Sequence, residues 1–162
     1  MRIADTVSDS IVDGTGLRFV VFTQGCPHLC EGCHNTHTHD FDGGTDVTTD
    51  ELFKKIETNP LCDGLTLSGG EPFSQAAECA ELAKRVKEHG LNVWTYSGWT
   101  LETLTSDTPP AENCAELLKY TDVLIDGRFE LSKRTLALKW RGSSNQRVWE
   151  QFASGEWRLK DI

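Results

Sequence analysis

The sequence of 162 residues has no long apolar run, and its longest stretch covers only Phe19 to Phe22. A helix that spans a bilayer needs about 20 apolar residues, so no membrane segment is expected. Residues 1–5 (MRIAD) also lack the apolar stretch of a secretory signal peptide. We therefore expect a protein of the cytoplasm that has no membrane partner.

The chain also lacks an excess of positive charge, because it contains 16 Lys and Arg residues against 25 Asp and Glu residues, which gives a net charge of −9. This balance argues against a nucleic-acid partner, since such proteins neutralise phosphates with basic patches. Only a modest basic bias is present, between Lys133 and Arg147. Repeats, low-complexity tracts and linkers are absent as well, and the length suits one domain over residues 1–162.

Six cysteines are present, and their spacing is uneven. Without a secretion signal they are not expected to form disulfides, because the cytosol keeps thiols reduced. Three of them lie within residues 26–33, which indicates a set of ligands. The others are far apart and are interpreted as small buried residues with no assigned role: Cys62, Cys79 and Cys114.

The crowded cysteines lie in residues 25–35 (GCPHLCEGCHN), with the spacing Cys26-x3-Cys30-x2-Cys33. Soft thiolates suit either zinc or an iron–sulfur cluster. In a cubane cluster, three cysteines leave one iron without a protein ligand, and an open iron can bind a substrate. A Cys30–Cys33 redox pair is a weaker interpretation because it does not explain Cys26.

The zinc interpretation needs a fourth ligand, because structural zinc sites are usually four-coordinate. It predicts a non-catalytic binding module with a Cys3His site. Three nearby histidines are candidates for the fourth position: His34, His37 and His39.

The rest of the chain predicts strands that alternate with helices. Alternation of this kind predicts a parallel sheet in an open or partial barrel, since about five strands are too few to close one. Glycines follow the strands, at the edge that carries active sites in parallel α/β proteins. The expected strands are Leu17–Gln24, Gly64–Ser68, Leu91–Tyr96, Asp122–Asp126 and, less regularly, Leu136–Trp140.

Three helices are expected between these strands. Thr48 and Glu51 form a capping-box pattern ahead of an apolar face. The clearest helix covers about Phe73 to Glu88, with Gly90 suited to its C-terminal cap. A shorter one covers Glu112 to Tyr120.

The cysteine motif after the first strand and Gly-Gly-Glu-Pro at residues 69–72 together resemble the radical S-adenosylmethionine (SAM) superfamily. Together with three further segments these motifs make five matches that occur in order, at residues 13–18 (DGTGLR), 25–35, 67–72 (LSGGEP), 122–127 (DVLIDG) and 140–146 (WRGSSNQ). This set is similar to the family of activating proteins of anaerobic (class III) ribonucleoside-triphosphate reductases. The resemblance covers most of the chain.

The resemblance implies an open, partial (β/α) barrel of the radical SAM type, with a mostly parallel sheet of about five or six strands. It implies a 4Fe–4S cluster held by Cys26, Cys30 and Cys33. The reduced cluster would cleave SAM to a 5′-deoxyadenosyl radical, which makes a glycyl radical on the reductase. The cofactor carries this chemistry, so no catalytic side chain is expected. Contacts to SAM are expected from Gly32, Cys33, His34, Ser68, Gly69, Gly70 and Glu71.

The implied partners are the reductase and a one-electron donor such as a flavodoxin-type protein. Related alternatives are an activase of another glycyl-radical enzyme and a radical SAM synthase of small molecules. Thr15, Gly32 and His34 depart from common patterns, and His34 keeps the zinc interpretation open. Roles for Asp126, Arg128 and Arg141 stay open between ligand contact and solvated charge.

Overall fold

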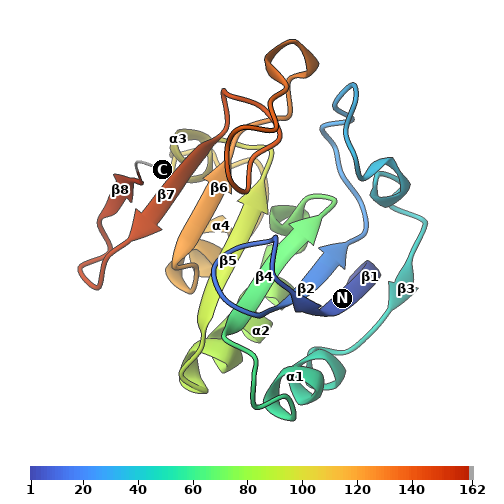
Figure 1. Cartoon of the computed structure of the whole chain (residues 1–162), viewed down its shortest axis with the longest axis vertical. Coiled ribbons are helices and arrows are strands. Elements are labelled where there is room, and N and C mark those ends of the chain that lie inside the picture. Colours follow the sequence, from blue (N-terminus) through green and yellow to red (C-terminus); the bar gives the residue numbers. More distant parts are fainter. Residues whose placement is uncertain (161–162) are drawn as a thin grey trace.

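The centre of the fold is one eight-stranded mixed sheet, seen in a computed structural model that describes residues 1–160 (Figure 1). The strand order is β3-β1-β2-β4-β5-β6-β7-β8. The strands are β1 (Arg2–Ser10), β2 (Arg18–Thr23), β3 (Thr45–Asp46), β4 (Gly64–Gly69), β5 (Asn92–Ser97), β6 (Val123–Asp126), β7 (Arg147–Gln151) and β8 (Trp157–Leu159).

The four central strands are parallel. β2 pairs with β4, β4 with β5, and β5 with β6, all in parallel register. They are the four strands that the apolar runs predicted, with ends shifted by at most one residue. Their loops therefore leave from one common edge of the sheet.

The flanking strands are antiparallel and were not predicted. β1 pairs with β2 and β3, while β7 pairs with β6 and β8. The strand predicted at 136–140 is wrong, because these residues form bends and a turn and Trp140 has a left-handed backbone with φ of 63°. The sheet thus has eight strands where five or six were expected.

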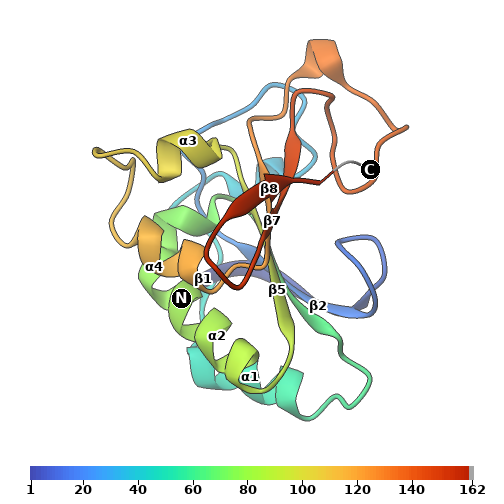
Figure 2. The same ribbon diagram turned by 90° about the vertical axis from the view of Figure 1, so that its left-hand side faces the viewer.

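Four helices lie on one side of the sheet (Figure 2). They are α1 (Thr49–Glu57), α2 (Ala76–Glu88), α3 (Leu101–Leu104) and α4 (Cys114–Lys119). The capping box of Thr48 and Glu51 is formed in both directions at the start of α1. A 3₁₀ turn (Pro72–Gln75) opens α2, and Gly90 follows α2 with φ of 87°. Within residues 1–160 none of the helices has the length and apolar character needed to cross a bilayer.

The main core lies between these helices and the sheet. Apolar residues of β2, β4 and β5 pack there against α1, α2 and α4. The three isolated cysteines belong to this core, as expected, since Cys62, Cys79 and Cys114 are all buried. Complete burial raises the pKa of the Cys79 thiol, so this residue stays a protonated core side chain.

The opposite face of the sheet has a smaller core and a buried arginine. Arg18 is fully buried and donates to Thr66 Oγ1 at 2.7 Å, Leu65 O at 2.7 Å and Thr15 O at 3.0 Å. Its guanidinium lies 5.3 Å from the Trp94 ring centroid. Desolvation lowers the pKa of Arg18 to about 10, so it stays charged near pH 7. These bonds fasten the loop at 11–17 to the sheet.

Candidate functional site

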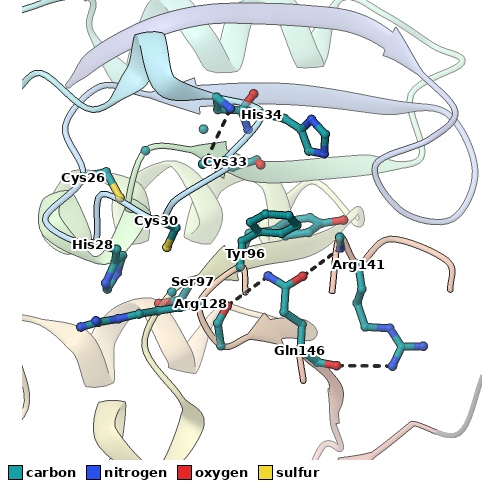
Figure 3. Close-up of a pocket in the computed structure, with 18 of the residues that line it drawn as sticks. Cys26, His28, Cys30, Cys33, His34, Tyr96, Ser97, Arg128, Arg141 and Gln146 are labelled. Atoms are coloured by element: carbon teal, nitrogen blue, oxygen red, sulfur yellow. Dashed lines mark hydrogen bonds between the residues drawn. The ribbon is translucent and has the colours of Figure 1, made fainter. Parts of the chain in front are cut away.

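A cavity of about 560 Å³ lies at the edge where the parallel strands end. One side is formed by the cysteine loop that follows β2, and another by the residues after β4. The loops after β5 and β6, with residues 140–146, complete the wall. Figure 3 shows Cys26 and Cys30 on one side of this space and Tyr96 and Gln146 on the other. The volume is within the range of small-molecule and cofactor sites.

The cysteine loop is held by its own backbone. Gly25 and Cys26 donate their amides to Thr38 O at 2.7 Å and His39 O at 3.1 Å. The Cys33 amide donates to Cys30 O at 3.2 Å, which closes a turn between two of the thiols. Leu29, inside this loop, has a left-handed φ of 49°. That conformation costs a non-glycine residue about 1 kcal/mol, so the loop is constrained rather than relaxed.

All three thiols of the loop line the cavity. Cys26 is buried, and Cys30 and Cys33 are partly exposed. Burial raises the pKa of the Cys26 thiol, although the backbone N–H groups of His28 and Leu29 oppose this shift. Burial also raises the pKa of the Cys30 thiol. Across residues 1–160, no three His, Cys, Asp or Glu side chains are gathered tightly enough to enclose a metal ion.

The wall beside the thiols is formed by Ser68, Gly69 and Gly70. The Gly70 amide donates to Thr23 O at 2.8 Å, which joins this wall to the end of β2. A β-carbon on Gly70 would come within 2.4 Å of Gly25 O. Glycine is therefore required for the two loops to approach this closely.

Glu71 does not line the cavity, although it follows this wall directly. Its carboxylate is fully buried, and Oε1 accepts from His28 Nε2 at 2.6 Å, Ser97 Oγ at 2.9 Å and the Gly98 amide at 2.8 Å. Oε2 accepts from the Phe73 amide at 3.1 Å. The carboxylate thus joins the cysteine loop to the ends of β4 and β5 from behind the cavity wall.

His28 belongs to this network and lines the cavity, as do Ser97 and Gly98. Its side chain is only 3% exposed, and its ring packs edge-on against Trp99 with centroids 4.8 Å apart. The other ring nitrogen, Nδ1, is buried and has no hydrogen-bond partner. A buried polar atom without a partner is uncommon and marks a place where a ligand can supply one.

The far wall carries aromatic and basic side chains. Tyr96, Arg128 and Arg141 line the cavity there, together with Phe129, Trp140 and Gln146. Gln146 holds the wall in place, because its Oε1 accepts the amides of Gly142 at 2.8 Å and Ser143 at 3.1 Å. Its Nε2 donates to Gly127 O at 3.1 Å. The polar residues at 140–146 therefore hold this segment in its loop conformation.

Asp126 lies outside the cavity and is fully buried. It accepts from Arg147 Nε at 3.1 Å and Nη2 at 2.6 Å, from the Leu101 amide at 2.7 Å and from Trp149 Nε1 at 3.1 Å. Arg147 also forms a bidentate pair with Glu102. Asp126 is thus neither a contact in the cavity nor a solvated charge, the two roles considered for it, but a buried carboxylate that joins α3 to β7.

Most site residues expected from the sequence meet at this cavity: Cys26, Cys30, Cys33, His34, Ser68, Gly69 and Gly70. Two do not line it, namely Glu71, described above, and Gly32, which faces Phe129 and Leu131. The roles of His28, Tyr96 and Gln146 were missed. The glycines after each strand were the available signal, since Gly98, Gly127 and Gly142 all line the cavity.

The donor set suits a soft metal centre. Three thiols line one side of a single cavity, and the wall next to them has no β-carbons at two successive positions. Thiolates are the ligands of iron–sulfur clusters. The residues therefore fit a cluster beside a small polar molecule.

Comparisons with known proteins agree with this class of site. The family model of the 4Fe-4S single cluster domain matches residues 12–149, which include the cysteine loop and nearly the whole cavity wall. The chain is thus a protein of the single-cluster 4Fe–4S class.

Curated relatives narrow the class further. A protein of Pasteurella multocida is 38% identical over 149 residues, which are 86% of this chain and 90% of the relative. One of Enterobacteria phage T4 is 36% identical, over 91% of this chain and 92% of the relative, and one of Escherichia coli K12 is 31% identical, over 85% and 91%. All three are named anaerobic ribonucleoside-triphosphate reductase-activating protein. The chain belongs to this family of activating proteins.

Proposed function

We propose that the chain is a radical SAM activase, which cleaves SAM at a 4Fe–4S cluster and generates a glycyl radical on an anaerobic ribonucleoside-triphosphate reductase. The observation that carries the proposal is the cavity, where three cysteines that are close together in the sequence line the same space as a glycine wall, at the ends of parallel strands. We also propose that the twisted sheet is the open, partial (β/α) barrel of radical SAM enzymes.

In this proposal Cys26, Cys30 and Cys33 hold the cluster through their thiolates. When bound there in its reduced form, the cluster supplies the electron that splits SAM into methionine and a 5′-deoxyadenosyl radical, which takes a hydrogen atom from a glycine α-carbon of the reductase.

The chain's own residues bind and orient SAM. The backbone carbonyl oxygens of Ser68, Gly69 and Gly70 can accept hydrogen bonds from the methionine ammonium group, because the two glycines have no side chain that would block its approach. In this proposal Cys33 and His34, which line the cavity, contact the adenine end, whereas Gly32 faces Phe129 and Leu131 instead. Arg128 and Arg141, on the far wall, provide cations for a carboxylate.

In this proposal Glu71 acts indirectly and does not contact SAM. Its carboxylate already accepts four hydrogen bonds within the protein, so it positions the glycine wall and the cysteine loop together. The aromatic rings of Tyr96 and Trp140 help to exclude water from the cavity, which protects a radical from side reactions.

The proposal places the protein in the cytoplasm, where its thiols stay reduced. It requires a one-electron donor such as a flavodoxin-type protein. Its protein substrate is the reductase that the relatives' names identify.

The first test is anaerobic reconstitution with iron and sulfide, followed by analysis of metal and sulfide content. We expect about four iron and four sulfide per chain, the composition of a cubane cluster. Single Cys26→Ala, Cys30→Ala and Cys33→Ala variants are expected to lose the cluster, whereas Cys62→Ala is the matched control that keeps it. Binding of one zinc and no iron would favour the non-catalytic Cys3His module instead.

The second test measures the reaction. With a chemical reductant, the reconstituted protein is expected to release 5′-deoxyadenosine from SAM, and in the presence of the reductase an electron paramagnetic resonance (EPR) signal of a glycyl radical should form. Release of 5′-deoxyadenosine without that signal would point to another glycyl-radical enzyme or a small molecule as the substrate.

A further inference from the structure

The loop between β6 and β7 has a charge opposite to that of the rest of the chain. Residues 128–147, here called the basic loop, contain six of the 16 Lys and Arg residues and only one acid, Glu130. The other 142 residues therefore hold 10 basic and 24 acidic residues. Two of these cations form ion pairs, Lys133 with Glu130 and Arg147 with Glu102 and Asp126. Six basic residues and one acid give the loop a formal net charge of +5.

The base of the basic loop is well ordered by hydrogen bonds. The Thr135 amide donates to Gly142 O at 3.0 Å, and the Ser144 amide donates to Lys133 O at 2.9 Å. Asn145 Nδ2 donates to Arg128 O at 2.8 Å. The bond between Ser144 and Lys133 closes a narrow loop, and the residues beyond it, 134–143, form the tip.

The tip presents exposed apolar and basic side chains together. Leu136 is 89% exposed, the highest value among the large apolar residues at positions 1–160, and Leu131 at the base is 44% exposed. Arg134 and Lys139, on either side of Leu136, are also exposed. Leu136 therefore contributes little buried surface to this chain, and an exposed apolar side chain flanked by cations offers a partner both an apolar anchor and charges around it.

The loop stands beside the cavity. It leaves the carboxyl end of β6, the same edge that carries the cysteine loop, and Arg128, Phe129 and Arg141 line the cavity wall. In Figures 1 and 2 it projects beyond the ends of the parallel strands. A macromolecule that brings a residue to the cavity must pass next to this loop.

We propose that the tip of the basic loop, with Arg134, Leu136 and Lys139 as its central contacts, is a docking surface for an acidic, partly apolar surface of the protein substrate. The inference rests on the proposed function, in which that substrate is the reductase. Charges at the rim of an interface act mainly on the rate of association and on its salt dependence, while an apolar anchor slows dissociation.

The experiment compares affinity for the purified cognate reductase between the wild-type protein, an Arg134→Glu/Lys139→Glu variant and a Leu136→Ser variant, all reconstituted. We expect each variant to bind at least tenfold more weakly at low salt, and the loss in the charge-reversed variant should shrink as salt is raised. SAM cleavage in the absence of the reductase should stay at the wild-type level, because none of these side chains lines the cavity.

Matched controls come from the other end and the helical side of the molecule. Lys55→Glu/Lys84→Glu reverses two exposed charges on α1 and α2, and Leu61→Ser changes a leucine that is 72% exposed before the start of β4. These variants should bind the reductase within about twofold of the wild type. A general effect of net charge or apolar area would weaken them as well, and would overturn the assignment of the loop.

The outcomes separate this inference from the function on which it rests. Unchanged affinity in both loop variants, with normal formation of the glycyl radical, would overturn the docking surface and leave the activase intact. Failure of the wild-type protein to form the radical would instead count against the activase. If the loop variants lose only affinity for an RNA or DNA oligonucleotide, the loop is a nucleic-acid site and the inference is wrong.

Discussion

At the scale of single residues, Glu71 and His28 organise the site from behind. The sequence motif suggested Glu71 as a direct contact to SAM, but its Oε1 already accepts three hydrogen bonds, one of them from His28 Nε2 at 2.6 Å. Through His28 the pair fixes the middle of the cysteine loop, between Cys26 and Cys30. A carboxylate buried without these donors would cost about 1–3 kcal/mol or more for each lost partner.

A His28→Ala variant tests this positioning role. We expect it to bind less than half the iron of the wild type after reconstitution, because the cysteine loop loses its side-chain anchor. His28→Gln, whose amide can still donate to Glu71, should recover much of that iron and a cluster EPR spectrum close to the wild type. His37→Ala is the control, since His37 lies in the same segment, is exposed and does not line the cavity. Equal iron content in the Ala and Gln variants would rule out the bond to Glu71 as the cause.

The arginine at position 18 illustrates what a sequence motif leaves open. It belongs to the residues that suggested the family, yet its full burial and its bonds to Thr66 and Leu65 give it a structural role. The identity of a single residue does not reveal whether its side chain is buried. Only the register of β2 against β4 places this side chain beneath the loop at 11–17.

At the scale of elements, buried strands were easier to predict than edge strands. β2, β4 and β6 are apolar runs with both faces covered, so their sequences stood out. β1 reads RIADTVSDS and β8 only WRL, and their pairing depends on neighbours far away in the chain. The segment at 136–140 has the composition of a strand, but its residues face solvent and the turn at Trp140.

The candidate site was predictable to a similar degree. The three cysteines and the glycine wall follow from motifs and from the rule that parallel strands end at one edge. Tyr96 and Gln146 were not predictable, because their contribution depends on how the loops after β5 and β6 fold over the cavity. The orientation of the Glu71 side chain toward the protein interior depends on the position of His28. The spacing of residues in the sequence does not reveal that position.

The link between α3 and β7 gives a prediction about pH. Hydrogen bonds from Arg147 lower the pKa of Glu102 to about 2, and the same arginine bonds the buried Asp126. A carboxyl with a lowered folded-state pKa stabilises the fold fully above its unfolded pKa, near 4.3. That contribution is lost as pH falls from there through about 2.

We therefore expect Glu102→Gln to lower the free energy of unfolding near pH 7 by about 1 kcal/mol or less, since the pair is exposed. The difference from the wild type should persist down to about pH 5 and shrink below it. Urea unfolding at pH 7, 5 and 4 measures this directly. Glu112→Gln, at an exposed residue before α4, is the matched control. A gap that widens toward acid would contradict the assigned direction.

At the scale of the whole molecule, the two faces of the sheet have different roles, since one packs against the helices and the other is covered by loops. The helical face holds the main core, with α2 at its centre, and supplies most of the buried apolar surface. The other face carries a small apolar cluster around Trp94. The loop between β1 and β2 lies on this side of the sheet (Figure 2), and its residues Val12 and Asp13 line the cavity. The residues that form the main core and those that line the cavity thus lie mainly on opposite faces of the sheet, and the parallel strands connect them.

This division predicts that binding at the cavity adds stability without altering the main core. A ligand at 100 times its dissociation constant stabilises a fold by about 2.7 kcal/mol. For a domain of this size, that corresponds to a rise in Tm of about 5–10 °C. We expect SAM to raise the Tm of the cluster-loaded protein by this amount and to leave the cluster-free protein and the Cys33→Ala variant unchanged. A Cys114→Ala variant, altered in the core on the helical face, should start from a lower Tm and still gain the same increment from SAM. An equal rise in the cluster-free protein would mean that SAM binds without the metal centre, and the thiols would then have no part in its recognition.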